Sequence, residues 1–327
     1  MKTLFNIGDK ITAGDIASYI FDTIRPVAGY SLRKLSNISG PVIRARRSID
    51  NKEFDFYADE IEGGELQSFA TGDGASDVYV TTWYDQFGNN NATQTSASNQ
   101  PKIWDASTGL VTENGKPAVD FTTNDAVLRG LLSIGSSITF FATGRIPADT
   151  LEALFELHQS GSNRFIVRAN SGAYEVFDQF SSGTYSNNQI LFSAHITASA
   201  SDAMYINGAN TETGSFSKLT TTDIAIGNDN TLSDSSIVQE LIIYNTDQSA
   251  NKETIETNVN QYYIIFGPLR YNQRITEDSG TFALTDRYEA VYDEVTEIAA
   301  PSLLCTCDAY KGSSLTTYGT LYNIIPE

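Results

Sequence analysis

Short runs of apolar and β-branched residues, broken by clusters of Ser, Gly and Asn, fill most of the chain up to residue 244. Such runs favour strands, and turn signals at this spacing are typical of a β-sandwich rather than a parallel α/β sheet. The Asn207-Gly208 pair predicts a type I′ hairpin turn, because both residues accept a positive φ. Strands are expected at residues 42–46, 78–84, 118–121, 138–143, 163–168, 173–177, 190–197 and 237–244. The pattern predicts an all-β fold.

Two segments instead carry apolar residues at a helical spacing. Residues 9–24 have this pattern and are followed by Pro26, so a short N-terminal helix is expected. Ser249 can cap a second helix, in which the apolar residues up to position 263 recur on one face. Gly267-Pro268 then ends the helix and marks a boundary.

The 327 residues allow two domains, or one large all-β domain with extensions. The elements above favour the second organisation. We expect an N-terminal helical arm at 1–27, a β-sandwich at 28–266 and an acidic C-terminal extension at 267–327 that shows little periodicity.

The charge is strongly negative and unevenly distributed. Forty Asp and Glu against 21 Lys and Arg give −19, which disfavours nucleic acid as a partner. Residues 1–50 hold eight basic and four acidic side chains, a balance of +4, whereas the remainder holds 13 and 36, a balance of −23. The basic N-terminal part could therefore dock against acidic surfaces.

Cysteine usage and apolar runs bear on the compartment. Cys305 and Cys307 are too few for a disulfide framework and suggest two free thiols, with a metal shared between subunits as the alternative. The apolar start at residues 4–5 is soon interrupted by charges, so we expect no signal peptide. No run approaches 18 apolar residues, so no membrane span is expected.

Two segments of the first hundred residues resemble the opening of the α-L-arabinofuranosidase B catalytic domain. They are GYSLRKL with GPVIRARRSIDN, within residues 29–51, and VTTWYDQFGNNNATQ, residues 80–94. Residues 138–263 are similar to a concanavalin A-like, laminin G-type sandwich. The resemblance covers about residues 28–265 and implies a two-sheet jelly roll. The same motif set resembles bacteriophage virion proteins, which carry such domains on tails, collars, heads and fibres.

A retaining glycosidase needs two carboxylates about 5–5.5 Å apart. Residues 227–230 match the turn that carries the family's acid/base, so the resemblance gives Asp229 that position. The best counterpart of the nucleophile strand is 165–171, in which Asn170 takes the nucleophile position, although Glu175 is near enough to compensate. With one carboxylate missing, the resemblance implies a sandwich without catalytic residues.

Sugar binding is an alternative role for the loops. Asp85, Asn228 and Asp229 could contact a glycan, and Trp83 could stack on a sugar ring. Asp85 is equally typical of a residue that closes a turn by bonding its own backbone. Of Trp83 and its neighbour Tyr84, one must face the core of the sheet.

The remaining charged residues have mainly structural interpretations. No cofactor is expected, although the loop acids Asp73 and Asp77, like Asp229 and Asp234, could hold Ca²⁺. Glu240 lies inside an apolar strand, where arginine or backbone groups could satisfy it, or where a cleft could raise its pKa. The arginines at 44, 46 and 47 are expected to pair with the acids at 53, 55, 59, 60 and 62.

The sequence thus leads to one main hypothesis. The protein is expected to be a virion structural protein with a non-catalytic jelly roll, located in the virion as a symmetric oligomer. Its partners would be copies of itself and other virion proteins. The alternatives are an adhesin that recognises host surface glycans and an active α-L-arabinofuranosidase.

Overall fold

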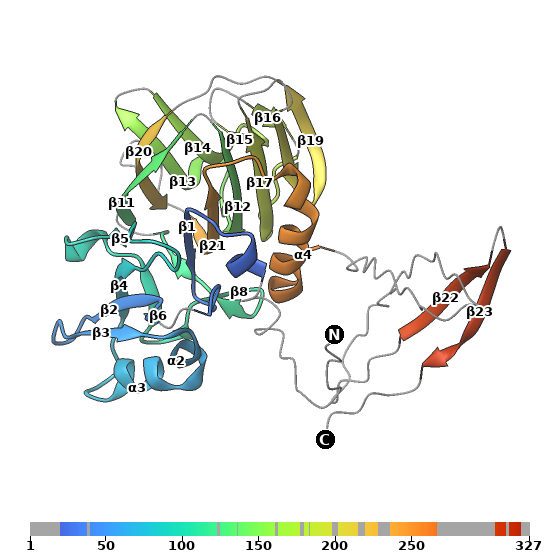
Figure 1. Ribbon diagram of the computed structural model, residues 1–327. Helices are drawn as coiled ribbons and strands as arrows, with labels where there is room; N and C mark the ends of the chain where they lie inside the picture. Colours follow the sequence, from blue (N-terminus) through green and yellow to red (C-terminus); the bar gives the residue numbers. More distant parts are fainter. Residues whose placement is uncertain are drawn as a thin grey trace, which may run out of the picture. The chain divides into compact units, whose positions relative to one another are not determined.

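The computed structural model describes residues 20–266 and 305–321. Within these ranges the gaps are 38–39, 123–124, 136, 161–162, 177–179, 183, 198–201, 215–219, 228–235 and 312–313. The chain forms two units, Met1–Ile265 and Phe266–Glu327. The first unit is an all-β sandwich with a few helices (Figure 1).

One layer of the sandwich is built around β12 and β21, which pair with each other. Its strand order is β19 (Ala209–Gly214), β18 (Asp202–Ile206), β17 (Ile190–Ile196), β12 (Ile138–Arg145), β21 (Ile237–Tyr244) and β1 (Ala28–Ser31). A short strand, β10 (Val119–Asp120), pairs with the other half of β21. All these pairings are antiparallel.

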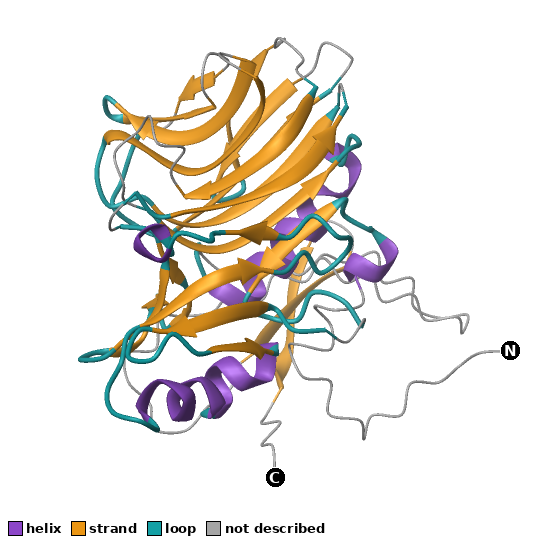
Figure 2. Ribbon diagram, turned by 90° about the vertical axis from the view of Figure 1, so that its left-hand side faces the viewer, coloured by secondary structure: helices purple, strands orange, loops and turns teal. Residues whose placement is uncertain are grey.

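The second layer is longer and also antiparallel. Its order is β16 (Phe180–Ser182), β15 (Ala173–Val176), β14 (Asn163–Asn170), β13 (Thr150–Ser160), β20 (Thr221–Gly227), β11 (Val127–Ile134), β5 (Ala92–Thr93), β4 (Val78–Trp83), β2 (Ile43–Arg47) and β3 (Glu53–Phe56). β6 (Lys102–Asp105) pairs with β4, β10 and β7 (Gly109–Leu110), while β8 (Thr112–Glu113) pairs with β9 (Lys116–Pro117). β6 therefore joins the two layers, which are stacked in Figure 2.

The apolar core lies between the layers, because strands present alternate residues to it. Phe140 of β12 meets Phe155 of β13 with ring centroids 5.1 Å apart. Phe192 of β17 meets Tyr174 of β15 at 6.3 Å. These edge-to-face contacts tie one layer to the other.

The outer face of the β12–β21 layer is covered by helix α4 (Lys252–Tyr263). Ser193 of β17 donates a hydrogen bond of 2.6 Å to Glu256 of this helix. The predicted cap at Ser249 is wrong, because Ser249 lies in a 3₁₀ turn (Ser249–Asn251) and Asn251 holds the N-cap position. The helix covers side chains that would otherwise face solvent, so several polar groups of this layer are buried.

The strands expected from the pattern form with their ends displaced by two residues or fewer. The predicted hairpin is confirmed, since Asn207 and Gly208 have φ of 52° and 78°. The pattern missed α2 (Ala58–Gly63), α3 (Glu65–Thr71), β11 and β13. The two helices are short and acidic, and glutamates and a histidine interrupt the apolar run of β13. Their sequences therefore look like loops.

The structure also tests the predictions for the segments before and after the sandwich. Residues 20–23 are helical and Ile24 is not, while residues 9–19 of the predicted helix lie outside the described residues. The C-terminal unit was expected to show little periodicity, yet it contains an antiparallel pair, β22 (Cys305–Lys311) and β23 (Ser314–Leu321). Over the part of the chain that the structure describes, no helix is long and apolar enough to cross a membrane.

Candidate functional site

The pairing of β14 with β15 places Asn170 and Glu175, two of the residues that the glycosidase resemblance singled out, at one end of the second layer. Arg168 of β14 lies opposite Glu175 of β15 and Ala153 of β13. β20 ends nearby at Gly227, because Ile226 lies opposite Phe155. Asn228 and Asp229 follow β20 in the sequence, and both residues lie outside the described part of the chain.

The carboxylate of Glu175 accepts hydrogen bonds from two neighbouring side chains. Arg168 donates to Glu175 Oε2 from Nε and Nη2, each at 2.8 Å. Asn170 donates from Nδ2 to Glu175 Oε1 at 3.0 Å. Both oxygens of the carboxylate that could replace the nucleophile therefore accept hydrogen bonds, and Asn170 itself has an amide, which is not a nucleophile for this reaction.

Asp85 closes a turn through its carboxylate. Oδ1 accepts from the backbone N–H of Gly29 at 2.9 Å and of Phe87 at 3.0 Å. Oδ2 accepts from Nδ2 and the backbone N–H of Asn90, at 2.9 and 3.3 Å. Asp85 is only 7% exposed, so its carboxylate serves the turn rather than a ligand. The turn-forming interpretation is confirmed.

Trp83 is fully buried, so the prediction that it stacks on a sugar is wrong. The pleat sends its neighbour Tyr84 to the other face, where the hydroxyl donates to Asp55 at 2.8 Å. A Cβ added to Gly29 would come within 2.6 Å of the Phe87 ring. The two segments that carry the family resemblance therefore contact each other, and Gly29, Asp85 and Phe87 have structural roles in that contact.

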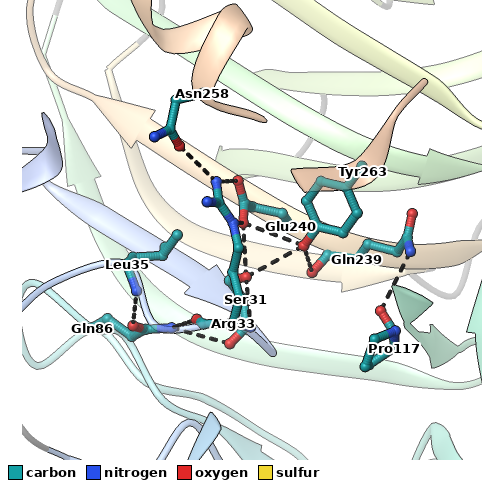
Figure 3. Close-up of polar contacts among 9 residues, drawn as sticks. All are labelled: Ser31, Arg33, Leu35, Gln86, Pro117, Gln239, Glu240, Asn258 and Tyr263. Carbon is teal, nitrogen blue, oxygen red and sulfur yellow. Dashed lines mark hydrogen bonds and ion pairs between the residues drawn. The ribbon is translucent and has the colours of Figure 1, made fainter. Parts of the chain in front are cut away.

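Glu240 is satisfied by an arginine, one of the two interpretations that the sequence left open. Arg33 donates to it from Nε at 2.7 Å and from Nη2 at 2.8 Å, and both side chains are buried. Ser31 donates to Glu240 Oε2 at 2.8 Å, and the hydroxyl of Tyr263 lies 3.3 Å from the same oxygen (Figure 3). Asn258 of α4 accepts from Arg33 at 2.9 Å.

Burial disfavours the charge of Arg33, but the carboxylate of Glu240 outweighs that effect, so the pKa of Arg33 is raised above its ordinary value. Burial also raises the pKa of the Tyr263 hydroxyl well above 10. At neutral pH Arg33 is therefore charged, and the Tyr263 hydroxyl is a neutral phenol. The cluster joins β1, β21 and α4, so it stabilises the fold.

Of the four loop acids proposed for Ca²⁺, Asp73 and Asp77 are engaged by cationic side chains, whereas Asp229 and Asp234 lie outside the described residues. Asp73 pairs with Arg47 and, at 3.6 Å, with Lys52. Asp77 lies 3.0 Å from Lys102 Nζ. Burial raises the pKa of Asp77, yet hydrogen bonds from the backbone N–H of Ala106 and from Lys102 outweigh it and keep that pKa below its usual range. Within the described residues, no group of three or more His, Cys, Asp or Glu could hold a metal ion.

The arginines of β2 pair only partly as expected. Arg44 contacts Glu53 at 2.7 Å and Asp55 at 3.5 Å, as predicted. Arg47 pairs with Asp50 and Asp73, and Arg46 donates to Gln100 and Asn51. The expectation that all three reach acids between 53 and 62 is therefore wrong, because neighbouring turns supply closer acceptors.

Two surface hollows lie beside α2. The larger, about 660 Å³, is named the Asp85 hollow here and is lined by Lys34, Gly40, Pro41, Val42, Tyr57, Ala58, Asp59, Glu60, Asp85, Gln86, Phe87 and Gly88. The smaller, about 470 Å³, is lined mainly by Phe54, Phe56, Phe69 and the glutamates at 60 and 65. From the sequence, Asp85 was singled out as a candidate site residue of the Asp85 hollow, but Tyr57, Asp59 and Lys34 were not. An exposed tyrosine ahead of an acidic helix was the available signal.

His195 of β17 gives this unit a pH-dependent stability. It is buried beneath α4, with Nδ1 3.2 Å from Thr139 Oγ1. Burial lowers its pKa to about 4; Asp247 opposes this and Lys252 adds to it. Because the folded pKa lies below the unfolded value of about 6.5, the histidine's contribution is complete above pH 6.5 and is lost as the pH falls to 4.

We expect the sandwich to lose up to about 3 kcal/mol through this histidine between pH 6.5 and 4. Urea unfolding across that range should show a shallower pH dependence in His195→Gln than in the unmodified chain. Equal slopes in the two proteins would contradict the assignment to His195.

Comparison with known proteins finds a shared fold. No family model matches the chain, and no curated protein matches it either. A mutant of a GH54 α-L-arabinofuranosidase, soaked with 4-nitrophenyl α-L-arabinofuranoside, is similar at TM-score 0.57 and 14% identity over 80% of this chain and 68% of that one. Trypanosoma rangeli sialidase with the inhibitor DANA has TM-score 0.41 and 12% identity, over 56% of this chain and 32% of that one. The binding domain of botulinum neurotoxin serotype D has 0.35 and 11%, over 53% and 50%. The first likeness gives the chain a β-sandwich of the kind found in the GH54 arabinofuranosidase.

Proposed function

We propose that this chain is a virion structural protein of a bacteriophage, built on a non-catalytic, lectin-like β-sandwich. The observation that carries the non-catalytic part is the Arg168–Glu175 ion pair. It lies at the sheet end where the family resemblance requires a carboxylate free to attack. The virion part is supported by the sequence resemblance to virion proteins.

Retaining hydrolysis needs one carboxylate that attacks the sugar and one that transfers a proton. Asn170 has no charge to form the glycosyl-enzyme bond. Glu175 is neutralised by Arg168 and accepts a second hydrogen bond from Asn170, so it would have to break both interactions before it attacked. Neither of the two described residues at the nucleophile position, Asn170 and Glu175, would then serve as the nucleophile beside Asp229.

The purified chain is expected to give no hydrolysis of 4-nitrophenyl α-L-arabinofuranoside above the rate of its Asp229→Asn variant. Release of 4-nitrophenolate, followed by absorbance, measures this. Glu175→Gln serves as a matched variant, because it removes the ion pair and should affect stability rather than turnover. Turnover that Asp229→Asn or Glu175→Gln abolishes would make the chain a glycosidase and overturn the non-catalytic proposal.

Virion assignment is tested on particles rather than on the purified chain. Phage particles from the source culture, purified on a density gradient, are expected to contain the protein by mass spectrometry and to bind gold-labelled antibody against it. If the protein is found only in the particle-free lysate, the virion assignment fails, whatever the sandwich binds.

A second candidate function is an adhesin that recognises host surface glycans. The Asp85 hollow favours it, because that hollow is lined by donors, acceptors and an aromatic ring. The two functions are compatible, since a virion component can present a binding site.

A further inference from the structure

The Asp85 hollow has the size and the rigid walls of a binding site. Its volume of about 660 Å³ falls within the range of about 300–1,000 Å³ that is typical of small-ligand pockets. Three separate chain segments form it: the loop after β1, the first turn of α2 and the turn after β4.

Hydrogen bonds fix all three segments. Gln86 donates to the carbonyl oxygens of Ser31 and Arg33 at 3.1 and 2.9 Å and accepts from the N–H of Leu35 at 2.8 Å (Figure 3). Glu60 accepts from the N–H of Tyr57 at 2.9 Å. Binding here would therefore cost little ordering of the backbone.

The polar groups that remain available to a ligand belong to the exposed residues of the Asp85 hollow. The side-chain polar atoms of Asp85 and Gln86 already form hydrogen bonds, within the turn and with residues 29–35. Tyr57 is 43% exposed, and in the part of the chain that the structure describes neither Lys34 nor Asp59 has an ion pair. An ammonium donor, a carboxylate acceptor and an aromatic face thus border one hollow.

The charges and the aromatic ring of the Asp85 hollow favour some classes of ligand over others. The carboxylates of Asp59, Glu60 and Asp85 outnumber the single ammonium of Lys34, so an anion would be repelled. A purely apolar ligand would leave the charged groups desolvated and unpaired. A neutral sugar fits, because its hydroxyls both donate and accept, and the C–H face of its ring can pack on an aromatic side chain.

We propose that the Asp85 hollow binds a neutral sugar unit of a glycan. Tyr57 stacks on the ring, Lys34 donates to a hydroxyl oxygen and Asp59 accepts from a hydroxyl group. The inference rests on the proposed function and deepens it, since it gives the lectin-like sandwich a ligand class and a location that involves neither Trp83 nor the carboxylate of Asp85.

Saturation-transfer NMR on the full chain tests this, with the methyl glycosides of glucose, galactose, N-acetylglucosamine and α-L-arabinofuranose as probes at millimolar concentration. At least one glycoside is expected to bind. Tyr57→Ala should weaken its binding tenfold or more, whereas Tyr57→Phe should retain it. Phe54→Ala is the matched control, because Phe54 is also exposed, at 55%, but lines only the neighbouring hollow.

Absence of binding by all four glycosides would overturn the inference, as would binding that Tyr57→Ala leaves unchanged. Binding that is lost in Asp229→Asn but kept in Tyr57→Ala would assign the sugar to a site that contains Asp229 and would also overturn the inference. Tryptophan fluorescence verifies that each variant is folded. Failure of the proposed function is seen separately, as aryl arabinofuranoside turnover or as absence from particles, and neither result depends on Tyr57.

Discussion

Replacing Arg33 with methionine should lower the free energy of unfolding of the sandwich by about 3–5 kcal/mol. The substitution leaves the carboxylate of Glu240 buried without its cation, beneath α4 and beside Tyr263. Removing one member of a buried pair is costly because the remaining charge keeps its desolvation penalty and loses its partner. Urea unfolding followed by tryptophan fluorescence measures the change, since both tryptophans, Trp83 and Trp104, lie in this unit.

Two further variants make this test specific. The pair Arg33→Met with Glu240→Leu should recover part of the loss, because it removes both charges. Arg44→Met is the matched surface control: its ion pair with Glu53 is exposed, so its loss should cost less than about 1 kcal/mol. If Arg33→Met and Arg44→Met were equally stable, the buried cluster would not hold α4 to the sheet.

Replacing Asp85 with alanine should cost about 3 kcal/mol or more, the second large effect. The four donors that Asp85 accepts from belong to Gly29, Phe87 and Asn90, and buried N–H groups left without an acceptor cost about 1–3 kcal/mol each. The loss should appear as a lower urea midpoint with an unchanged m-value.

Asp105→Ala is the control for this turn. Asp105 also accepts from the backbone N–H groups two and three residues ahead, those of Ser107 and Thr108, but its turn is on the surface, where water can replace the lost acceptor. We expect it to cost clearly less than Asp85→Ala. If Asp85→Ala had normal stability but no longer bound sugar, Asp85 would be a ligand-binding residue rather than a structural one.

The sequence pattern predicted those parts of the fold whose signals are local. The strand at 237–244 and the turn at Asn207-Gly208 depend on β-branched residues and on backbone conformations that neighbouring residues determine. The β-sandwich followed from the number and spacing of such strands, and the likeness to the GH54 arabinofuranosidase confirms it. The helices α2 and α3 were not predicted because they are short and show no apolar periodicity: α2 buries only Ile61, and α3 buries only Leu66 and Ala70.

The candidate site was predicted less well than the fold. Asp85 was singled out correctly as a special residue, but its four hydrogen bonds assign it to the turn, and the burial of Trp83 removes the expected stacking surface. The same reasoning overlooked Tyr57, since one exposed aromatic residue has no periodicity to mark it. The virion location and the lack of catalysis stay predictions for the assays above.

The sequence by itself determined an all-β fold, the turn that Asp85 closes and the need of Glu240 for a partner. Only the tertiary structure decided that the partner of Glu240 is Arg33, more than two hundred residues away, and that Glu175 is held by Arg168. The physical reason is the separation along the chain over which each kind of interaction acts. Strand propensity and turn conformation act between neighbours in the chain, whereas burial, ion pairing and the walls of a hollow arise when distant segments meet.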